Sequence, residues 1–196
     1  MSNITSNPHD YLLLHLDLTD HTKWLKSNVF PKHLAKKELG VSIIKKLEDY
    51  RFKKLFWNGD GGVFFADPEG RADYDFVVDA TDNVYELFEN WQTNYRELET
   101  QLLALRVCAD VASIFTDVDT SFWTSRYMNL FIKFERKITE KGFAIGEQIN
   151  DKLTSQKQHR FDGYNGHKGY KRQIGIKDPT IVWYDSTHST SGMDKE

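Results

Sequence analysis

Residues 12–22 of the chain read LLLHLDLTDHT, and residues 55–65 read LFWNGDGGVFF. Each stretch contains an apolar run that leads to a carboxylate, Asp17 in the first and Asp60 in the second. The first run predicts a buried strand that breaks into a helix start, and the second predicts a hairpin with Asp60 at its turn. Two such carboxylates brought together are suited to Mg²⁺ or Mn²⁺, because these hard cations prefer oxygen ligands. We therefore expect a two-metal site that binds a nucleoside triphosphate through its phosphates.

The composition is that of one globular domain with a sizeable core. The 196 residues are 39% hydrophobic and 14% aromatic, with a formal net charge of -3. This balance gives no overall attraction to nucleic acid or to an anionic membrane, so neither is expected as a partner. The single cysteine, Cys108, lies in an apolar run and is expected to be a packed thiol. Because no leader pattern and no membrane-spanning apolar stretch is found, we expect a cytoplasmic protein.

Helix-like and strand-like segments alternate along the chain. Helical spacing is found in residues 21–50, 76–101, 122–141 and 147–153. Strands are predicted at 12–18, in the hairpin 54–66, and at 102–115, 142–146 and 174–184. Pro31 and Gly40 are expected to interrupt the first helix. The order predicts an α/β fold, an α+β sandwich, in a domain over residues 8–185 with a disordered tail over 186–196.

At this point the motifs resemble those of the class III nucleotide cyclases. The family motif Asp-Ile-x-x-Phe-Thr is similar to residues 17–22, and its Gly-Asp motif is similar to Gly59-Asp60. Residues 105–110 stand where the family has a strand of the Leu-Arg-Val-Gly-Ile-His type. The resemblance implies a central, mostly antiparallel sheet flanked by helices, with a ferredoxin-like core. It also implies cyclase activity with two Mg²⁺ or Mn²⁺ ions per site, held by Asp17, Leu18 and Asp60.

The resemblance further implies a homodimer whose active sites lie at the subunit interface. A family helix supplies, from the opposite subunit, an Asn that orients the ribose and, four residues on, an Arg for transition-state charge. Asn129 and Lys133 occupy these positions here. Lys133 departs from the pattern because an ammonium lacks the bidentate fork of a guanidinium, so Arg126 or Arg136 is an alternative.

Two groups of residues are expected to bind the triphosphate. The first lies at the expected helix start, where backbone N–H groups suit phosphates, and consists of Thr19, Asp20, His21 and Thr22. Asp20 is also expected to cap the helix. The second group is Lys171 and Arg172, which could replace a Lys-Gly contact of the family. His15 and His21 could bind metal, although we favour a structural role because they lack zinc-site spacing.

The expected base pocket differs from that of adenylyl cyclases. Those enzymes have a base-reading Lys where this chain has Phe56, and a second selector where it has Phe122. Together with Tyr50, these bulky side chains favour a one-ring base, with UTP ahead of CTP. The pattern resembles the small bacterial pyrimidine cyclases of the Pycsar antiphage system, which make cyclic UMP or cyclic CMP for a separate effector protein. An adenylyl cyclase with an atypical pocket and a catalytically silent nucleotide-sensing module remain alternatives.

Overall fold

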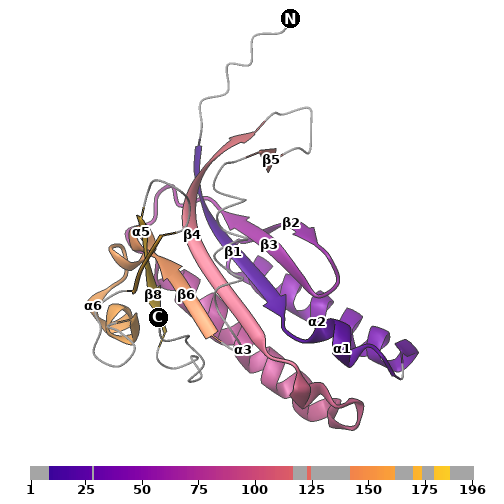
Figure 1. Cartoon of the computed structure of the whole chain (residues 1–196). Helices are drawn as coiled ribbons and strands as arrows, with labels where there is room; N and C mark the ends of the chain where they lie inside the picture. Colours follow the sequence, from indigo (N-terminus) through magenta and orange to yellow (C-terminus); the bar gives the residue numbers. More distant parts are fainter. Residues whose placement is uncertain are drawn as a thin grey trace, which may run out of the picture.

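A computed structural model describes residues 9–27, 29–116, 123–124, 142–161, 170–173 and 179–185 (Figure 1). Its strands are β1 (His9–Leu18), β2 (Lys53–Trp57), β3 (Gly61–Ala66), β4 (Leu105–Thr116), β5 (Trp123–Thr124), β6 (Gly142–Gly146), β7 (Tyr170–Gln173) and β8 (Pro179–Tyr184). They lie in the order β2-β3-β1-β4-β6-β8-β7, and β5 pairs with β4 beside this path. Only β4 and β6 pair in parallel among these strands, so the prediction of a mostly antiparallel sheet is confirmed.

The helices in the described ranges are α1 (His21–Trp24), α2 (Val29–Asp49), α3 (Asp75–Asn94), α5 (Glu147–Asn150) and α6 (Ser155–Gln158), with 3₁₀ turns η1 (Arg96–Leu98), η2 (Thr100–Leu102) and η3 (His159–Phe161). From β1 to β4 the chain follows a β-α-β-β-α-β order, and its strands lie as β4-β1-β3-β2. This is the ferredoxin-like core. The long helices α2 and α3 lie together on one face of the sheet (Figure 1). The predicted α+β sandwich is therefore confirmed.

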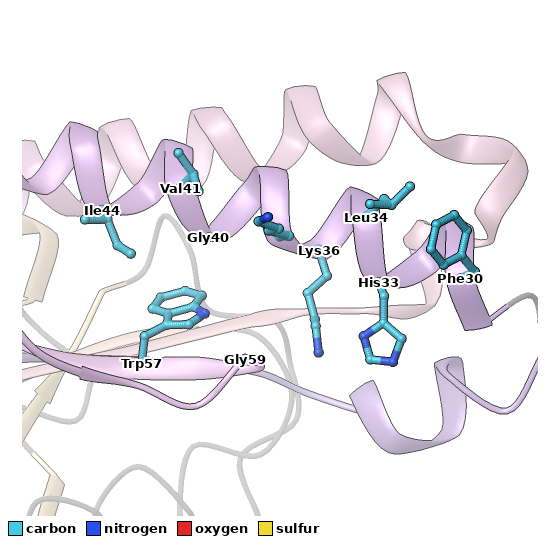
Figure 2. A pocket seen from close by; sticks show the side chains of 10 residues that line it. Phe30, His33, Leu34, Lys36, Gly40, Val41, Ile44, Trp57 and Gly59 are labelled. Carbon is cyan, nitrogen blue, oxygen red and sulfur yellow. The ribbon is translucent and has the colours of Figure 1, made fainter.

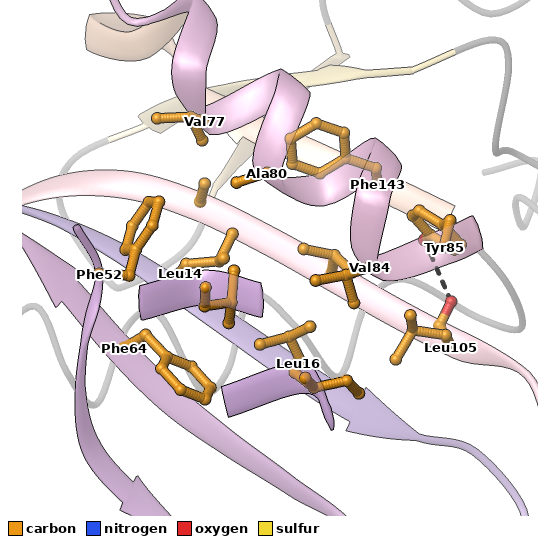
Figure 3. Close-up of a cluster of buried hydrophobic side chains, with 14 of the residues drawn as sticks. Leu14, Leu16, Phe52, Phe64, Val77, Ala80, Val84, Tyr85, Leu105 and Phe143 are labelled. Carbon is orange, nitrogen blue, oxygen red and sulfur yellow. Dashed lines mark hydrogen bonds between the residues drawn. The ribbon is translucent and has the colours of Figure 1, made fainter. Parts of the chain in front are cut away.

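The alternation of strand side chains separates a core from an opposite sheet face. On β1 the residues Leu12, Leu14, Leu16 and Leu18 belong to the core cluster under the helices. Figure 3 shows this cluster, in which the Tyr85 hydroxyl donates to the Leu105 carbonyl at 3.2 Å. Successive strand residues point to opposite faces, so Asp17 emerges on the face away from α2 and α3.

The segment predicted as one helix over residues 21–50 forms two helices, α1 and α2. The prediction that Pro31 and Gly40 interrupt a helix is wrong. Pro31 lies in the first turn of α2, where its missing N–H removes no intrahelical hydrogen bond. Gly40 lies inside α2 without a break. The Trp57 indole of β2 packs so closely there that a Cβ at Gly40 would lie 3.1 Å from the ring. Gly40 therefore serves packing between α2 and β2 rather than helix termination.

Other boundaries also differ from the prediction. The helix expected over 76–101 ends at Asn94, and η1 and η2 follow before β4. The helix expected over 147–153 is α5 and ends at Asn150, and β7 is a strand that its polar sequence did not indicate. Most of the predicted helix 122–141 lies outside the described residues, but its residues 123–124 form β5 instead. The tail 186–196 also lies outside them. Cys108 is buried, as predicted.

None of the helices in the described ranges combines the length and apolar composition that a membrane crossing requires.

Acidic residues along α3 pair with the segment that follows α5. The pairs are Asp75 with Thr154, Asp79 with Lys157, and Asp82 with Arg160. Arg160 donates to both carboxylate oxygens of Asp82, at 2.6 and 2.7 Å, and its guanidinium also contacts Asp185. The Asp185 side chain is 0% exposed. Arg160 therefore neutralises a buried carboxylate that follows β8 while joining it to α3.

We expect Arg160→Ala to lower the free energy of unfolding by about 3 kcal/mol, because the buried Asp185 carboxylate loses its charged partner. Lys157→Ala is the matched control, since its pair with the half-exposed Asp79 is worth no more than about 1 kcal/mol. Urea denaturation of the two variants measures the difference. Equal losses would contradict a special role for Arg160.

Candidate functional site

The pairing of β1 with β3 brings Asp17 and Asp60 together. In this register Asp17 lies opposite Gly61, the residue after Asp60. The Leu18 N–H donates to the Asp60 carbonyl at 2.8 Å, so the hairpin turn is fastened to the end of β1. Two aspartates that are far apart in sequence thus occupy neighbouring backbone positions where β1 meets the hairpin turn.

Two glycines make this close approach possible. Gly59 has a φ of +89°, a turn conformation that side chains with a Cβ rarely adopt. The Asn58 N–H closes the turn by donating to the Gly61 carbonyl at 2.8 Å. A Cβ on Gly61 would lie 2.2 Å from the Leu16 carbonyl oxygen. The glycines that flank Asp60 therefore set its position relative to Asp17.

Arg106 of β4 lies on the other side of Asp17. The two residues are directly opposite in the β1–β4 register, and Arg106 Nη2 donates to Asp17 Oδ2. Their side chains are 18% and 21% exposed, respectively. The arrangement places a guanidinium and two carboxylates within three neighbouring strands.

His21 and Lys36 contact the Asp60 side of the site. Lys36 Nζ lies 3.0 Å from His21 Nε2, and His21 Nδ1 lies 3.5 Å from Asp60 Oδ2. Because a lysine ammonium can only donate, Nε2 accepts and the ring proton on Nδ1 faces Asp60. Burial, with the nearby Lys36 charge, lowers the pKa of His21, and burial also lowers the pKa of Lys36. A neutral imidazole therefore joins Asp60 to helix α2.

Burial also shifts the pKa of two groups on the same sheet face. It lowers the pKa of His15 to about 4, so this imidazole is neutral at pH 7. It raises the pKa of Asp110 on β4 to about 6. His15 therefore adds no positive charge beside Asp17 at neutral pH.

Hydrogen bonds within the protein already occupy some of the backbone N–H groups near the end of β1. The Leu18 N–H donates to the Asp60 carbonyl, and the Thr19 N–H donates to the Ala104 carbonyl at 2.9 Å. The Thr19 N–H is therefore occupied within the fold, contrary to the prediction that it binds phosphate. Within the described ranges, no backbone carbonyl accepts from the next three N–H groups, those of Asp20, His21 and Thr22.

Asp20 does not cap α1 with its side chain, contrary to the prediction. Its backbone is left-handed, with a φ of +55°, and its carboxylate accepts from Lys23 Nζ at 2.6 Å. The Asp20 carbonyl still receives the first helical hydrogen bond, from the Trp24 N–H at 2.9 Å. The sharp turn after β1 accounts for the difference, because it directs the side chain toward Lys23 and solvent.

The carboxylate oxygens of Asp17 and Asp60 are suited to a hard divalent cation whose remaining ligands come from the substrate. Within the described residues, no group of three or more His, Cys, Asp or Glu side chains is placed to hold a metal ion. Two carboxylates do not fill an octahedral shell alone, but Mg²⁺ is commonly bound by one or two carboxylates together with water and substrate phosphates. Asp17 and Asp60 therefore could hold Mg²⁺ or Mn²⁺ when a triphosphate supplies further oxygens.

The predicted base-binding residues lie at different places. Tyr50 follows α2, and its hydroxyl accepts from Asn83 Nδ2 at 2.9 Å. Strand β2 separates Tyr50 from the Asp60 turn by about 17 Å, at about 3.3 Å per residue. The structure therefore does not bring Tyr50 to the carboxylates. Phe56 is half-buried on β2 beside a bulge and pairs with Val63, while Phe122 lies outside the described residues.

Lys171 and Arg172 are far from Asp17 and Asp60 within one chain. Lys171 and Arg172 lie on β7, at the opposite edge of the sheet from the hairpin. Four strand spacings separate β7 from β1, and at about 4.8 Å each they amount to about 19 Å. Asn129 and Lys133 lie outside the described residues.

Sequence reasoning missed Arg106 and Lys36. Arg106 lies in the strand segment that resembles the cyclases, but its contact with Asp17 depends on a register between segments far apart in sequence. Lys36 is one of several lysines on α2, and its sequence neighbours do not distinguish it. A pairing of residues 9–18 with 105–114 would have indicated Arg106, whereas no local signal indicates Lys36.

Gly61→Ala is expected to separate β1 from β3 and to lower the free energy of unfolding by about 3 kcal/mol, because the new Cβ overlaps the Leu16 carbonyl. Gly70→Ala is the control for backbone strain without a clash, since Gly70, unlike Gly61, has a positive φ, of +74°, and has no atom within 4 Å of a Cβ. It should cost about 1 kcal/mol through backbone strain alone. Thermal and urea unfolding compare the variants, and equal destabilisation would contradict the steric account.

Comparison with known proteins finds this fold in solved structures of nucleotide cyclases. No protein-family model matches the chain, and no curated protein matches it significantly in sequence. Among solved structures, the guanylyl cyclase Cya2 is 14% identical with a TM-score of 0.71, covering 95% of this chain and 96% of that chain. The adenylyl cyclase CyaB from P. aeruginosa is 12% identical with a TM-score of 0.62, covering 97% and 99%.

Adenylate cyclases from Trypanosoma brucei, solved in a monomeric state, are also similar. One of them is 14% identical with a TM-score of 0.67, and the alignment covers 100% of this chain and 95% of that chain. At these identities the likeness concerns architecture. The chain has the fold of the class III nucleotide cyclase catalytic domains.

Proposed function

We propose that this protein is a nucleotide cyclase that converts a pyrimidine nucleoside triphosphate, UTP ahead of CTP, into its 3′,5′-cyclic monophosphate and pyrophosphate. The observation that carries the proposal is the strand register that sets Asp60 beside Asp17. The shared fold with adenylyl and guanylyl cyclases supports it. As in the antiphage systems that the sequence resembles, the product would be a second messenger read by a separate effector protein.

The proposed reaction makes one bond and breaks one bond at the α-phosphorus. The ribose O3′ attacks this phosphorus, its proton passes to solvent, and the bond to the bridging oxygen of the leaving pyrophosphate breaks. Two Mg²⁺ or Mn²⁺ ions at Asp17, Leu18 and Asp60 would supply positive charge to the phosphates. Arg106 is placed to bind phosphate oxygens once a cation takes over the Asp17 carboxylate. His21 holds Asp60 in orientation from the helix side.

A homodimer would complete the site. Lys171 and Arg172 lie about 19 Å from β1 within one chain, as four strand spacings of about 4.8 Å require. A second copy could bring them to the phosphates, together with Asn129 for the ribose and Lys133 for transition-state charge. The half-exposed Asp60 side chain, 41% exposed, leaves room for such an approach. Each subunit alone would then be inactive.

The choice of base rests on Phe56. Its β2 position is where adenylyl cyclases carry a base-reading lysine, and a phenylalanine offers no hydrogen bond to a purine edge. An adenylyl cyclase with an atypical pocket is the main alternative, and the purine cyclases among the similar structures favour it. The Arg106–Asp17 ion pair favours a second alternative, a silent nucleotide-sensing module in which Arg106 permanently occupies the carboxylate.

Incubation of the purified protein with Mn²⁺ and, separately, ATP, GTP, CTP or UTP tests the proposal when products are identified by mass spectrometry. We expect cyclic UMP to form at least about tenfold faster than any purine product, because a tenfold preference needs only about 1.4 kcal/mol of differential transition-state binding. Asp60→Asn should abolish the product, whereas Asp67→Asn, a carboxylate in the loop after β3, should not. Predominant cyclic AMP would overturn the pyrimidine assignment, and no product with any substrate would support the silent module.

A further inference from the structure

A groove of about 410 Å³ lies along the outer face of α2, next to the β2–β3 hairpin (Figure 2). The helix contributes four apolar lining residues, Phe30, Leu34, Val41 and Ile44. Phe30 is 73% exposed, Leu34 53% and Val41 58%. Of the large hydrophobic residues exposed in the described ranges, only Leu102 lies outside α2. Such a concentration of exposed apolar surface is characteristic of an interaction site.

The spacing of the lining residues fits a helical partner. Positions 30, 34, 37, 41 and 44 all line the groove and alternate by four and three residues. This is the spacing with which one helix packs lengthwise along another. At about 1.5 Å per residue the stripe is about 21 Å long, which is about four helical turns. An amphipathic helix fits this length better than a compact small molecule.

The polar groups of the groove select an acidic partner. Its ionisable lining residues are His33, Lys36 and Lys37, all of them basic. The Trp57 indole forms part of the lining and packs against Gly40. The groove therefore offers donors and positive charge beside an apolar stripe. Carboxylates that flank the apolar face of a helix would complement both.

The same charges disfavour a second copy of this chain as the occupant. A two-fold contact buries a surface against its own copy, so the basic lining residues of both copies would share one interface in which the groove lining supplies no carboxylate to pair with them. Like charges that face each other across an interface oppose association. The groove is therefore suited to a different chain with acidic side chains.

The groove is connected to the candidate site through Lys36. This side chain lines the groove, and its Nζ lies 3.0 Å from His21 Nε2, which in turn links it to Asp60. Gly59, one residue before Asp60, also lines the groove. A partner carboxylate that draws the Lys36 ammonium toward the groove would weaken the contact between Lys36 and His21. The contact between His21 and Asp60 would change as a result. Occupation of the groove would in this way affect the Asp17–Asp60 site.

We propose that the α2 groove is the docking site for an acidic amphipathic helix of a partner protein, and that docking regulates the Asp17–Asp60 site. The docking part is independent of the proposed cyclase activity. The regulatory part rests on that proposed function.

Binding of two fluorescein-labelled peptides to the full chain tests the docking. One peptide is a helix of about 18 residues, or five turns, with leucines at four-three spacing and flanking glutamates. The matched peptide has lysines in place of the glutamates. In buffer without metal or nucleotide, fluorescence polarisation should show the acidic peptide binding at least about tenfold more tightly, a difference of about 1.4 kcal/mol.

Val41→Glu should weaken acidic-peptide binding at least about tenfold, and Lys37→Glu should reduce or reverse the preference between peptides. Leu102→Glu is the control, because Leu102 is 59% exposed but lies outside the groove, and its binding should equal that of the unmodified chain. Circular dichroism verifies that the variants fold. Equal binding of both peptides, no binding, or an equal effect of Leu102→Glu would overturn the proposal.

Sedimentation of Val41→Glu provides a second test. A change from dimer to monomer would show that a second copy covers this face and would overturn the acidic-partner proposal. Because peptide binding needs no metal or nucleotide, intact docking in a protein without cyclase activity would count against the proposed function alone. If the chain is active, the bound acidic peptide should change its rate at least about twofold, whereas an unchanged rate would overturn the regulatory part.

Discussion

Strand β1 pairs with β3 on one side and β4 on the other, and these two registers determine the candidate site. They set Asp17 opposite Gly61 and opposite Arg106. A slip of one residue would turn Asp17 into the core and expose Leu16, because strand side chains alternate between faces. Burying an ionised carboxylate among leucines costs several kcal/mol, so the hydrophobic core itself enforces the register. The position of Asp60 follows, since its hairpin is fastened to the end of β1.

The segment after β1 is held from the helical side of the molecule. The Trp24 indole N–H donates to the Leu98 carbonyl at 2.6 Å. Lys32, only 1% exposed, donates to the Trp24 carbonyl at 2.7 Å and lies 3.2 Å from Glu99. These contacts join α1, α2 and η1 behind the turn that carries His21. The core face thus supplies rigidity, and the opposite sheet face with the hairpin tip supplies the chemically active groups.

Sequence patterns predicted the parts of this arrangement that depend on local periodicity. Alternation along β1 predicted the buried strand, the glycines around Asp60 predicted the hairpin turn, and the helix–strand order predicted the α+β sandwich. The mostly antiparallel sheet and the ferredoxin-like core were implied by the resemblance to the class III cyclases. The Arg106 contact could not be found in this way, because it depends on strand pairing over a long sequence separation. Asp20 was misassigned because the left-handed turn after β1 overrides its usual capping preference. Tyr50 was grouped with Phe56 by size, although β2 holds it at the far end of the hairpin.

We propose that Asp17 and Asp60 act as one cation site. The test is to measure Mn²⁺ affinity by electron paramagnetic resonance in the presence of a non-hydrolysable triphosphate. The proteins compared are the unmodified chain, Asp17→Asn, Asp60→Asn and the double variant. A shared site predicts that each single change weakens binding at least about tenfold, and that the double variant loses clearly less than the sum of the single losses in free energy. Losses that add independently, or unchanged affinity in either single variant, would contradict the claim.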